Sequence, residues 1–99
     1  MQPKPNETGR IHIWVTGRVQ GVGFRDFVQK AGVRLALTGW VRNVGYDSVE
    51  TVAEGPHDRL QEFAGAVKTG PGAARVDDAK IEWEQFTGEF QKFGVKYSL

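Results

Sequence analysis

Apolar and polar residues alternate over residues 11–16, whose sequence is Ile-His-Ile-Trp-Val-Thr. This period of two is typical of a β-strand with one buried face, so we expect a strand here. The period changes after residue 23, where apolar residues recur at i, i+3, i+4, i+7 and i+11, the spacing of one helix face. The residues on that face are Phe24, Phe27, Val28, Ala31 and Leu35.

A β-hairpin is expected next, because residues 39–44 and 48–54 have strand-like sequences and a turn, Gly-Tyr-Asp, separates them at 45–47. The Gly-Pro pair at 55–56 predicts the start of a second helix, since the first helical turn tolerates proline. The Gly-Pro pair at 70–71 predicts its end. The apolar face of this helix consists of Leu60, Phe63, Ala64 and Val67.

The last elements are a fourth strand over 79–84, where the alternation returns, and a short fifth strand near 93–97. The resulting order is β-α-β-β-α-β followed by a terminal strand, which is the ferredoxin-like split βαβ pattern of the α+β class. We therefore expect an antiparallel sheet in the order 4-1-3-2 with both helices on one face. This domain should span residues 10–99, preceded by a flexible N-terminal tail over 1–9.

Composition and charge narrow the function classes. The chain of 99 residues fits one domain, and its net charge of +1 argues against a nucleic-acid binder or a polybasic membrane anchor. Trp14 and Trp40 could stack on bases, but packing on the sheet is the better interpretation, because the aromatic strand motif of RNA-recognition domains is absent. With no cysteine, signal peptide or membrane-spanning stretch, we expect a soluble, cytoplasmic monomer.

A glycine-rich loop at 17–23, Gly-Arg-Val-Gln-Gly-Val-Gly, joins the first strand to the first helix. Such a loop suits an anion, because glycines let the backbone close on a phosphate and the first helical turn offers free N–H groups. It matches neither the P-loop nor the dinucleotide-binding fingerprint. Arg25 in the first turn could hold phosphate oxygens bidentately. The spacing alone leaves open a plain turn beside a solvated Arg25.

The loop and the following Phe24-Arg25 resemble the signature of the acylphosphatase family. The sequence Gly-Trp-Val-Arg-Asn at 39–43 resembles that family's second motif, and Val-Glu-Thr-Val-Ala-Glu-Gly at 49–55 resembles its third strand and turn. The stretch Gly-Pro-Gly-Ala-Ala-Arg-Val at 70–76 resembles the family's connection before the fourth strand. The resemblance covers residues 11–97.

The resemblance implies an enzyme that hydrolyses the carboxyl-phosphate bond of an acyl phosphate to a carboxylate and inorganic phosphate, without metal or cofactor. Arg25 would bind the phosphoryl group and Asn43 would orient the attacking water. In the expected topology the C-terminal ends of the first and second strands lie at one edge of the sheet, and the third strand between them sets these strands about 9–10 Å apart, which leaves room for a phosphate, a water and the Arg25 side chain. Backbone N–H groups would complete the phosphate cradle at Arg18, Val19, Gln20, Gly21, Val22, Gly23, Phe24 and Arg25.

The other candidate groups give weaker evidence for a functional site. His12 and His57 have no second ligand at metal spacing, and Asp77-Asp78 is expected in a solvated loop. A different class remains open: a non-enzymatic anion-binding module, such as the acylphosphatase-like domain of larger maturation proteins. Turnover of benzoyl phosphate separates the two.

Three positions depart from the family pattern. Ala36 stands where a glycine usually ends the first helix, and a left-handed alanine costs about 1 kcal/mol, so the helix could end differently. Gly32 stands inside that helix, where relatives often have alanine. Val44 follows Asn43 in place of a small hydroxyl residue.

Arg18 and Arg42 are expected on the surface, where either could steer an anionic substrate.

Overall fold

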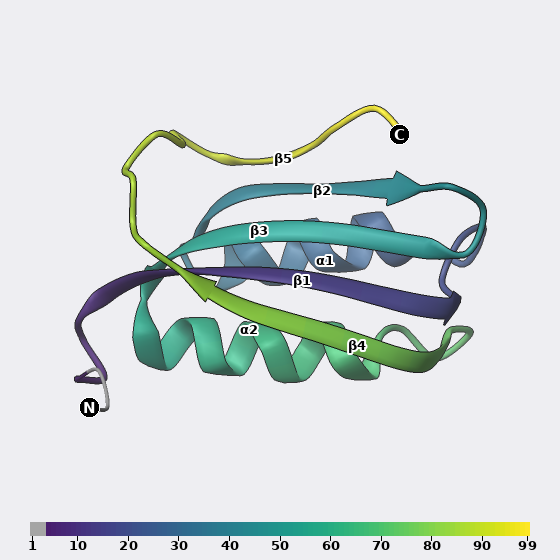
Figure 1. Cartoon of the computed structure of the whole chain (residues 1–99), viewed down its shortest axis with the longest axis horizontal. Coiled ribbons are helices and arrows are strands. Elements are labelled where there is room, and N and C mark those ends of the chain that lie inside the picture. Colours follow the sequence, from purple (N-terminus) through teal and green to yellow (C-terminus); the bar gives the residue numbers. More distant parts are fainter. Residues whose placement is uncertain (1–3) are drawn as a thin grey trace.

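The computed structural model describes residues 4–99 and consists of a five-stranded sheet with two helices on one face (Figure 1). The strand order is β4-β1-β3-β2-β5. The elements are β1 (Thr8–Arg18), α1 (Phe24–Arg34), β2 (Thr38–Val44), β3 (Ser48–Pro56), α2 (His57–Thr69), β4 (Arg75–Glu84) and β5 (Phe93–Val95). The expected α+β, ferredoxin-like fold is confirmed.

The strand pairing brings the ends of β1 and β2 to the same edge of the sheet. Both strands pair antiparallel with β3, which lies between them, so they run in the same direction. The short strand β5 adds to the expected 4-1-3-2 order by pairing parallel with β2. The β1–α1 loop and the end of β2 therefore lie near each other, although they are far apart in sequence.

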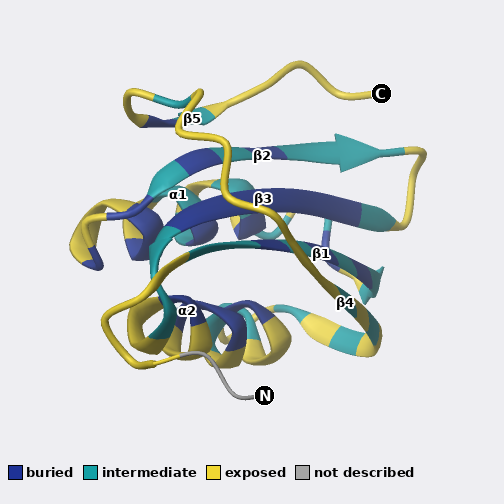
Figure 2. Ribbon diagram, turned by 60° about the vertical axis from the view of Figure 1, so that its left-hand side comes forward, coloured by how far each residue is buried: buried dark blue, intermediate teal, exposed yellow. Residues whose placement is uncertain are grey.

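The core lies between the sheet and the helices. The alternating residues Ile11, Ile13 and Val15 of β1 are fully buried and meet the apolar faces of both helices. Phe24 from α1 and Phe63 from α2 are the largest fully buried side chains among the described residues. In Figure 2 the buried positions of each helix face the sheet, while the opposite faces are exposed. The 3.6-residue spacing read from the sequence is thus the spacing of the packed faces.

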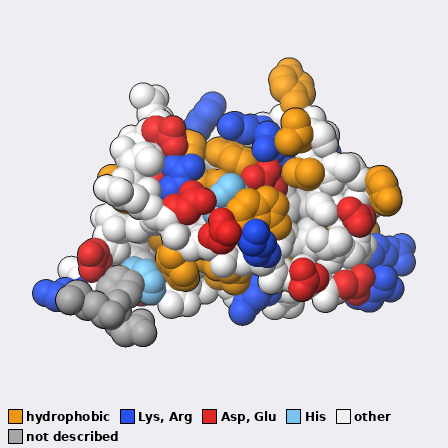
Figure 3. All heavy atoms as spheres, viewed as in Figure 1, with side chains coloured by type: hydrophobic (Ala, Val, Ile, Leu, Met, Phe, Trp, Pro, Cys, Tyr) orange, Lys and Arg blue, Asp and Glu red, His pale blue; other side chains and the backbone are white. Residues whose placement is uncertain are grey.

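The other face of the sheet carries an ion-pair network rather than helices. His12 stacks on Trp14 with ring centroids 3.8 Å apart, and its two ring nitrogens lie 2.6 Å from Glu50 and 3.0 Å from Glu84. The hydrogen bond with His12 lowers the pKa of the Glu84 carboxyl from its ordinary value, and Arg10 acts in the same direction against partial desolvation. Figure 3 shows this face, with acidic and basic side chains gathered around hydrophobic ones.

The strand β4 begins earlier than expected, which corrects the placement of Asp77 and Asp78 in a loop. The added residues pair with the end of β1, where Gly17 allows the close approach: a Cβ there would lie 2.4 Å from the Arg75 carbonyl oxygen. Apolar alternation begins only near Ala79, because the preceding side chains are mostly exposed. The periodicity that predicts strands therefore missed this part of β4.

The ends of the helices also differ in detail from expectation. Pro56 is the last residue of β3 and the N-cap of α2, so it precedes the first turn rather than occupying it. Ala36 does adopt the left-handed conformation, with φ 56°. Its N–H bonds to the Val33 carbonyl and the Leu37 N–H bonds to the Gly32 carbonyl, the Schellman pattern. Helix α1 therefore ends as it would with glycine.

The tail expected over 1–9 falls partly on residues 1–3, which lie outside the described residues. Within residues 4–9, β1 already begins at Thr8. The carbonyls of Glu7 and Pro5 accept hydrogen bonds from the first N–H groups of α2, at His57 and Asp58. Within residues 4–99, neither helix is long and apolar enough to cross a membrane.

Candidate active site

The loop at residues 19–23 turns from β1 into α1 through two glycines with positive φ. Gly21 has φ 72° and Gly23 has φ 77°, a conformation that other residues adopt at a cost. Gly23 is the N-cap of α1, and no side chain caps this helix end. The N–H groups of the first turn are therefore left for an anion, and the partial positive charge of the helix N-terminus adds to the attraction.

The side chain of Gln20 fixes this loop against the β2–β3 hairpin. Its Nε2 donates to the carbonyl oxygens of Ser48 at 2.9 Å, Gly45 at 3.2 Å and Val44 at 3.3 Å. The loop is thereby held at a set distance from the end of β2, where Asn43 lies. Sequence analysis assigned Gln20 only a backbone role, because no local pattern indicates side-chain contacts with residues more than twenty positions away.

Two further residues anchor the loop from beneath. The side chains of Val19 and Phe24 are buried in the core, with exposed fractions of 0% and 1%. Neither can reach a ligand with its side chain, so each can contribute only its backbone. Arg25 follows Phe24 directly and is half-buried. Because Phe24 is held in the core, the next residue along α1 is directed toward β2.

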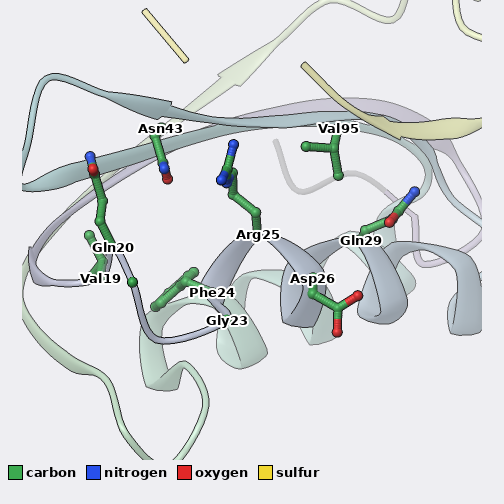
Figure 4. A pocket seen from close by; sticks show the side chains of 10 residues that line it. Val19, Gln20, Gly23, Phe24, Arg25, Asp26, Gln29, Asn43 and Val95 are labelled. Carbon is green, nitrogen blue, oxygen red and sulfur yellow. The ribbon is translucent and has the colours of Figure 1, made fainter. Parts of the chain in front are cut away.

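A pocket of about 360 Å³ lies between α1, the loop and β2. In Figure 4 the side chains of Arg25 from α1 and Asn43 from β2 point into the same space. The two predicted residues are thus brought together by elements separated in sequence. The lining residues are Val19, Gln20, Gly21, Gly23, Phe24, Arg25, Asp26, Gln29, Asn43 and Val95.

Two residues of the predicted cradle do not line this pocket. Arg18 is the exposed last residue of β1, and Val22 packs against the core. Conversely, the sequence missed Asp26, Gln29 and Val95. The first two could have been found from their helical positions beside Arg25, but Val95 comes from β5, whose place next to β2 has no local signal.

The charge of Arg25 is not compensated by a neighbour. Within residues 4–99 its guanidinium makes no hydrogen bond or ion pair. Asp26, the acidic residue of the lining, pairs with Lys30 at 2.9 Å and points away from the pocket in Figure 4. The pocket therefore combines an uncompensated cation, free backbone N–H groups and the neutral amide of Asn43, a set that suits a phosphoryl group and a water. The described residues hold no cluster of three metal-ligating side chains.

Comparison with known proteins identifies the family of this chain. The family described as Acylphosphatase matches residues 11–95. An acylphosphatase from Syntrophotalea carbinolica is 47% identical over 88 residues, covering 89% of this chain and 96% of the relative. The crystal structure of acylphosphatase from Bacillus subtilis superposes with a TM-score of 0.86 at 40% identity, covering 90% of this chain and 99% of that one.

A part of a larger protein also shares the fold. The structure of T. kodakarensis HypF matches with a TM-score of 0.77 at 32% identity, covering 89% of this chain but 12% of that one. The curated relative and the Bacillus subtilis structure, by contrast, are matched over nearly their whole lengths. The chain thus belongs to the acylphosphatase family, the enzymes that hydrolyse the carboxyl-phosphate bond of acyl phosphates.

Proposed function

We propose that Arg25 binds the phosphoryl group of the acyl phosphate and that Asn43 orients the water that attacks it. The observation that carries this assignment is the convergence of the two side chains, from α1 and β2, on one pocket. The guanidinium offers a planar fork of donors for phosphate oxygens. The amide of Asn43 can accept from water and donate to it, so it can set the direction of the oxygen lone pair.

The reaction needs little from the protein beyond positioning the water and the phosphoryl group and stabilising the charge that develops. The water oxygen forms a bond to phosphorus while the bond between phosphorus and the bridging oxygen breaks, and the carboxylate leaves with that electron pair. Because a carboxylate is a stable anion, the leaving group needs no proton. The water gives up its protons to the phosphate and the solvent. Charge grows on the equatorial oxygens in the loose transition state, where Arg25 and the loop amides stabilise it.

We infer a phosphate cradle made of the backbone N–H groups between Arg18 and Arg25. The positive φ values of Gly21 and Gly23 support it, since they turn the chain around a compact ligand. The three hydrogen bonds from Gln20 support it further by holding the cradle beside β2. Arg18 and Val22, whose side chains lie outside the pocket, would contribute backbone groups alone.

We also propose that hydrolysis proceeds without a metal ion or cofactor. The guanidinium and the helix N-terminus supply the positive charge that a metal would supply in other phosphoryl-transfer sites. Benzoyl phosphate should be hydrolysed at the same rate before and after exhaustive chelation, and inorganic phosphate should inhibit competitively. Loss of turnover on chelation, restored by a divalent ion, would contradict this mechanism.

The second candidate function is that of an anion-binding module without turnover. The observation that favours it is the fold match to part of HypF, a much longer chain. This candidate predicts saturable phosphate binding with no release of benzoate. If the protein is an enzyme, it should both bind phosphate and release benzoate from benzoyl phosphate. A single purified preparation, assayed for phosphate binding and for benzoyl phosphate hydrolysis, separates the two.

We further infer that the protein acts in the cytoplasm as a monomer, with neither nucleic acid nor membrane as partner. The absence of cysteine from the sequence fits a reducing compartment, and the net charge of +1 offers no broad cationic surface. Sedimentation at the mass of one chain, unchanged by concentration, is the expected result. A dimer in that measurement would contradict this inference.

A further inference from the structure

A second, larger cavity adjoins the pocket that we assign to the phosphoryl group. It has a volume of about 860 Å³ and shares Arg25 and Val95 with that pocket. Its lining residues are Arg25, Arg42, Val95, Lys96, Tyr97, Ser98 and Leu99. Three of these side chains are cationic, and within residues 4–99 no acidic side chain joins the lining.

We propose that this cavity receives the acyl group, and that Arg42 and Lys96 make the enzyme prefer acyl phosphates whose acyl group carries a second anion. The inference rests on the proposed function, because it places the phosphoryl group on Arg25. With the phosphoryl group there, the remainder of the substrate must extend into adjoining open space. The second cavity offers that space, because Arg25 and Val95 line both cavities.

Trp40 organises the two cations of the acyl cavity. The Lys96 ammonium lies 4.5 Å from its ring centroid, and the Arg42 guanidinium carbon lies 5.0 Å from it. A cation held on an aromatic face keeps its position while leaving its remaining N–H groups free. Both residues line the cavity, and their charged groups lie with Trp40 and Glu50 over the face of the sheet opposite the helices, although they come from β2 and from the segment after β5.

The two cations differ in how far they are already paired. Arg42 donates through Nε and Nη2 to one oxygen of Glu50, each at 2.8 Å, so part of its charge is compensated. Lys96 makes no ion pair within 4 Å in residues 4–99, although its charge adds to the Arg10 hydrogen bond in lowering the pKa of the more distant Glu89, and its side chain is exposed. Lys96 is thus the cation more available to a ligand, and Arg42 adds to the field around it.

The wall that carries Lys96 is held along β2. The Lys96 N–H donates to the Val41 carbonyl at 2.9 Å, and the Leu99 N–H donates to the Asn43 carbonyl at 2.8 Å. The Gly45 N–H in turn donates to the Leu99 carbonyl at 2.8 Å. These bonds fix the cavity wall to the strand that bears Asn43, so the acyl and phosphoryl parts of the site keep a set relation.

The test compares two substrates of nearly equal shape, 4-carboxybenzoyl phosphate and 4-carbamoylbenzoyl phosphate, which differ in one negative charge. We expect a KM about three- to fivefold lower for the carboxylate substrate, the size typical of a solvated ion pair. Raising the ionic strength should reduce this preference, because salt screens exposed charges. The kcat values should be similar for both.

Lys96→Met should raise the KM for the carboxylate substrate alone and roughly halve the preference, and adding Arg42→Met should bring the two KM values together. Lys80→Met is the matched control: Lys80 also lies over a tryptophan, Trp14 at 5.1 Å, but lines neither cavity, so the preference should persist. Equal KM values in the unaltered protein, or a preference unaffected by Lys96→Met, would overturn the inference while leaving hydrolysis intact. Failure to hydrolyse either substrate would instead overturn the proposed function.

Discussion

The ring of Phe93 occupies the space that a β-carbon on Gly32 would need. An added Cβ at Gly32 would lie 2.4 Å from Cδ2 of Phe93, far inside van der Waals contact. Phe93 is 4% exposed and also packs against Phe63, with ring centroids 5.6 Å apart, so it has little room to move. This contact ties β5 to α1, and β5 in turn supplies Val95 to the pocket.

Gly32→Ala should therefore destabilise the protein, although alanine favours a helix. Overpacking a core costs about 1–3 kcal/mol, which exceeds the gain of about 1 kcal/mol in helix propensity, so the free energy of unfolding should fall by about 1 kcal/mol. Urea denaturation measures it. Gly65→Ala is the matched control, since nothing lies within 4 Å of its added Cβ. It should stabilise, and an equal gain from Gly32→Ala would contradict the packing argument.

Ala36→Gly should stabilise the protein. Ala36 has φ 56°, and glycine adopts this conformation without the steric cost of a β-carbon. We expect the free energy of unfolding to rise by about 1 kcal/mol. Ala66→Gly, inside α2, should lower it by a similar amount. No gain at Ala36 in the same denaturation experiment would mean that α1 does not end in the left-handed cap.

Gln20→Ala should reduce activity more than stability. The side chain holds the loop to the hairpin through three carbonyl oxygens, and small displacements of a positioned group are costly in turnover. We expect kcat/KM to fall by roughly tenfold or more. Gln91→Ala, at an exposed position outside the pocket, should leave it unchanged. Unaltered kcat/KM in Gln20→Ala would show that these bonds do not position the loop.

Glu84 should contribute stability that acid removes. Its pKa is lowered in the folded protein, chiefly by the hydrogen bond with His12. A lowered pKa stabilises the fold above the unfolded value, near 4.5, and this stabilisation disappears as the pH falls through the folded pKa. The difference in unfolding free energy between the unaltered protein and Glu84→Gln should therefore be largest above pH 5 and shrink below pH 4.

Denaturation between pH 3 and pH 6 measures this contribution. Glu82→Gln is the control, because Glu82 makes a longer, exposed pair with Lys80 at 3.5 Å. Its effect should vary less with pH. A Glu84→Gln difference that stays constant across the range would contradict the linkage.

Sequence reasoning predicted the parts of the fold that depend on local pattern. The alternation in β1 and the helical spacing from Phe24 onward both describe residues with one buried face, which is why they were readable. The first residues of β4 were missed because Asp77 and its neighbours are mostly exposed on an edge strand, where no apolar alternation marks a strand. These residues form a regular strand, and the prediction missed them because their side chains are mostly exposed.

Sequence analysis could predict only those residues of the candidate site that belong to the family motifs. Arg25 and Asn43 stand in motif positions, and the strand order places them near each other. The side-chain bonds of Gln20 and the place of Val95 depend on contacts between distant segments, which have no sequence period.

The most direct test measures phosphate affinity and kcat on the same two variants, Arg25→Ala and Asn43→Ala, after circular dichroism confirms folding. Arg25→Ala should weaken phosphate binding and lower kcat by about a hundredfold, as for loss of a preorganised electrostatic donor. Asn43→Ala should lower kcat similarly while phosphate affinity stays within a few-fold, because the residue acts on the water. If Asn43→Ala abolishes phosphate binding and Arg25→Ala preserves it, the roles are reversed, and full turnover in both would place the active site elsewhere.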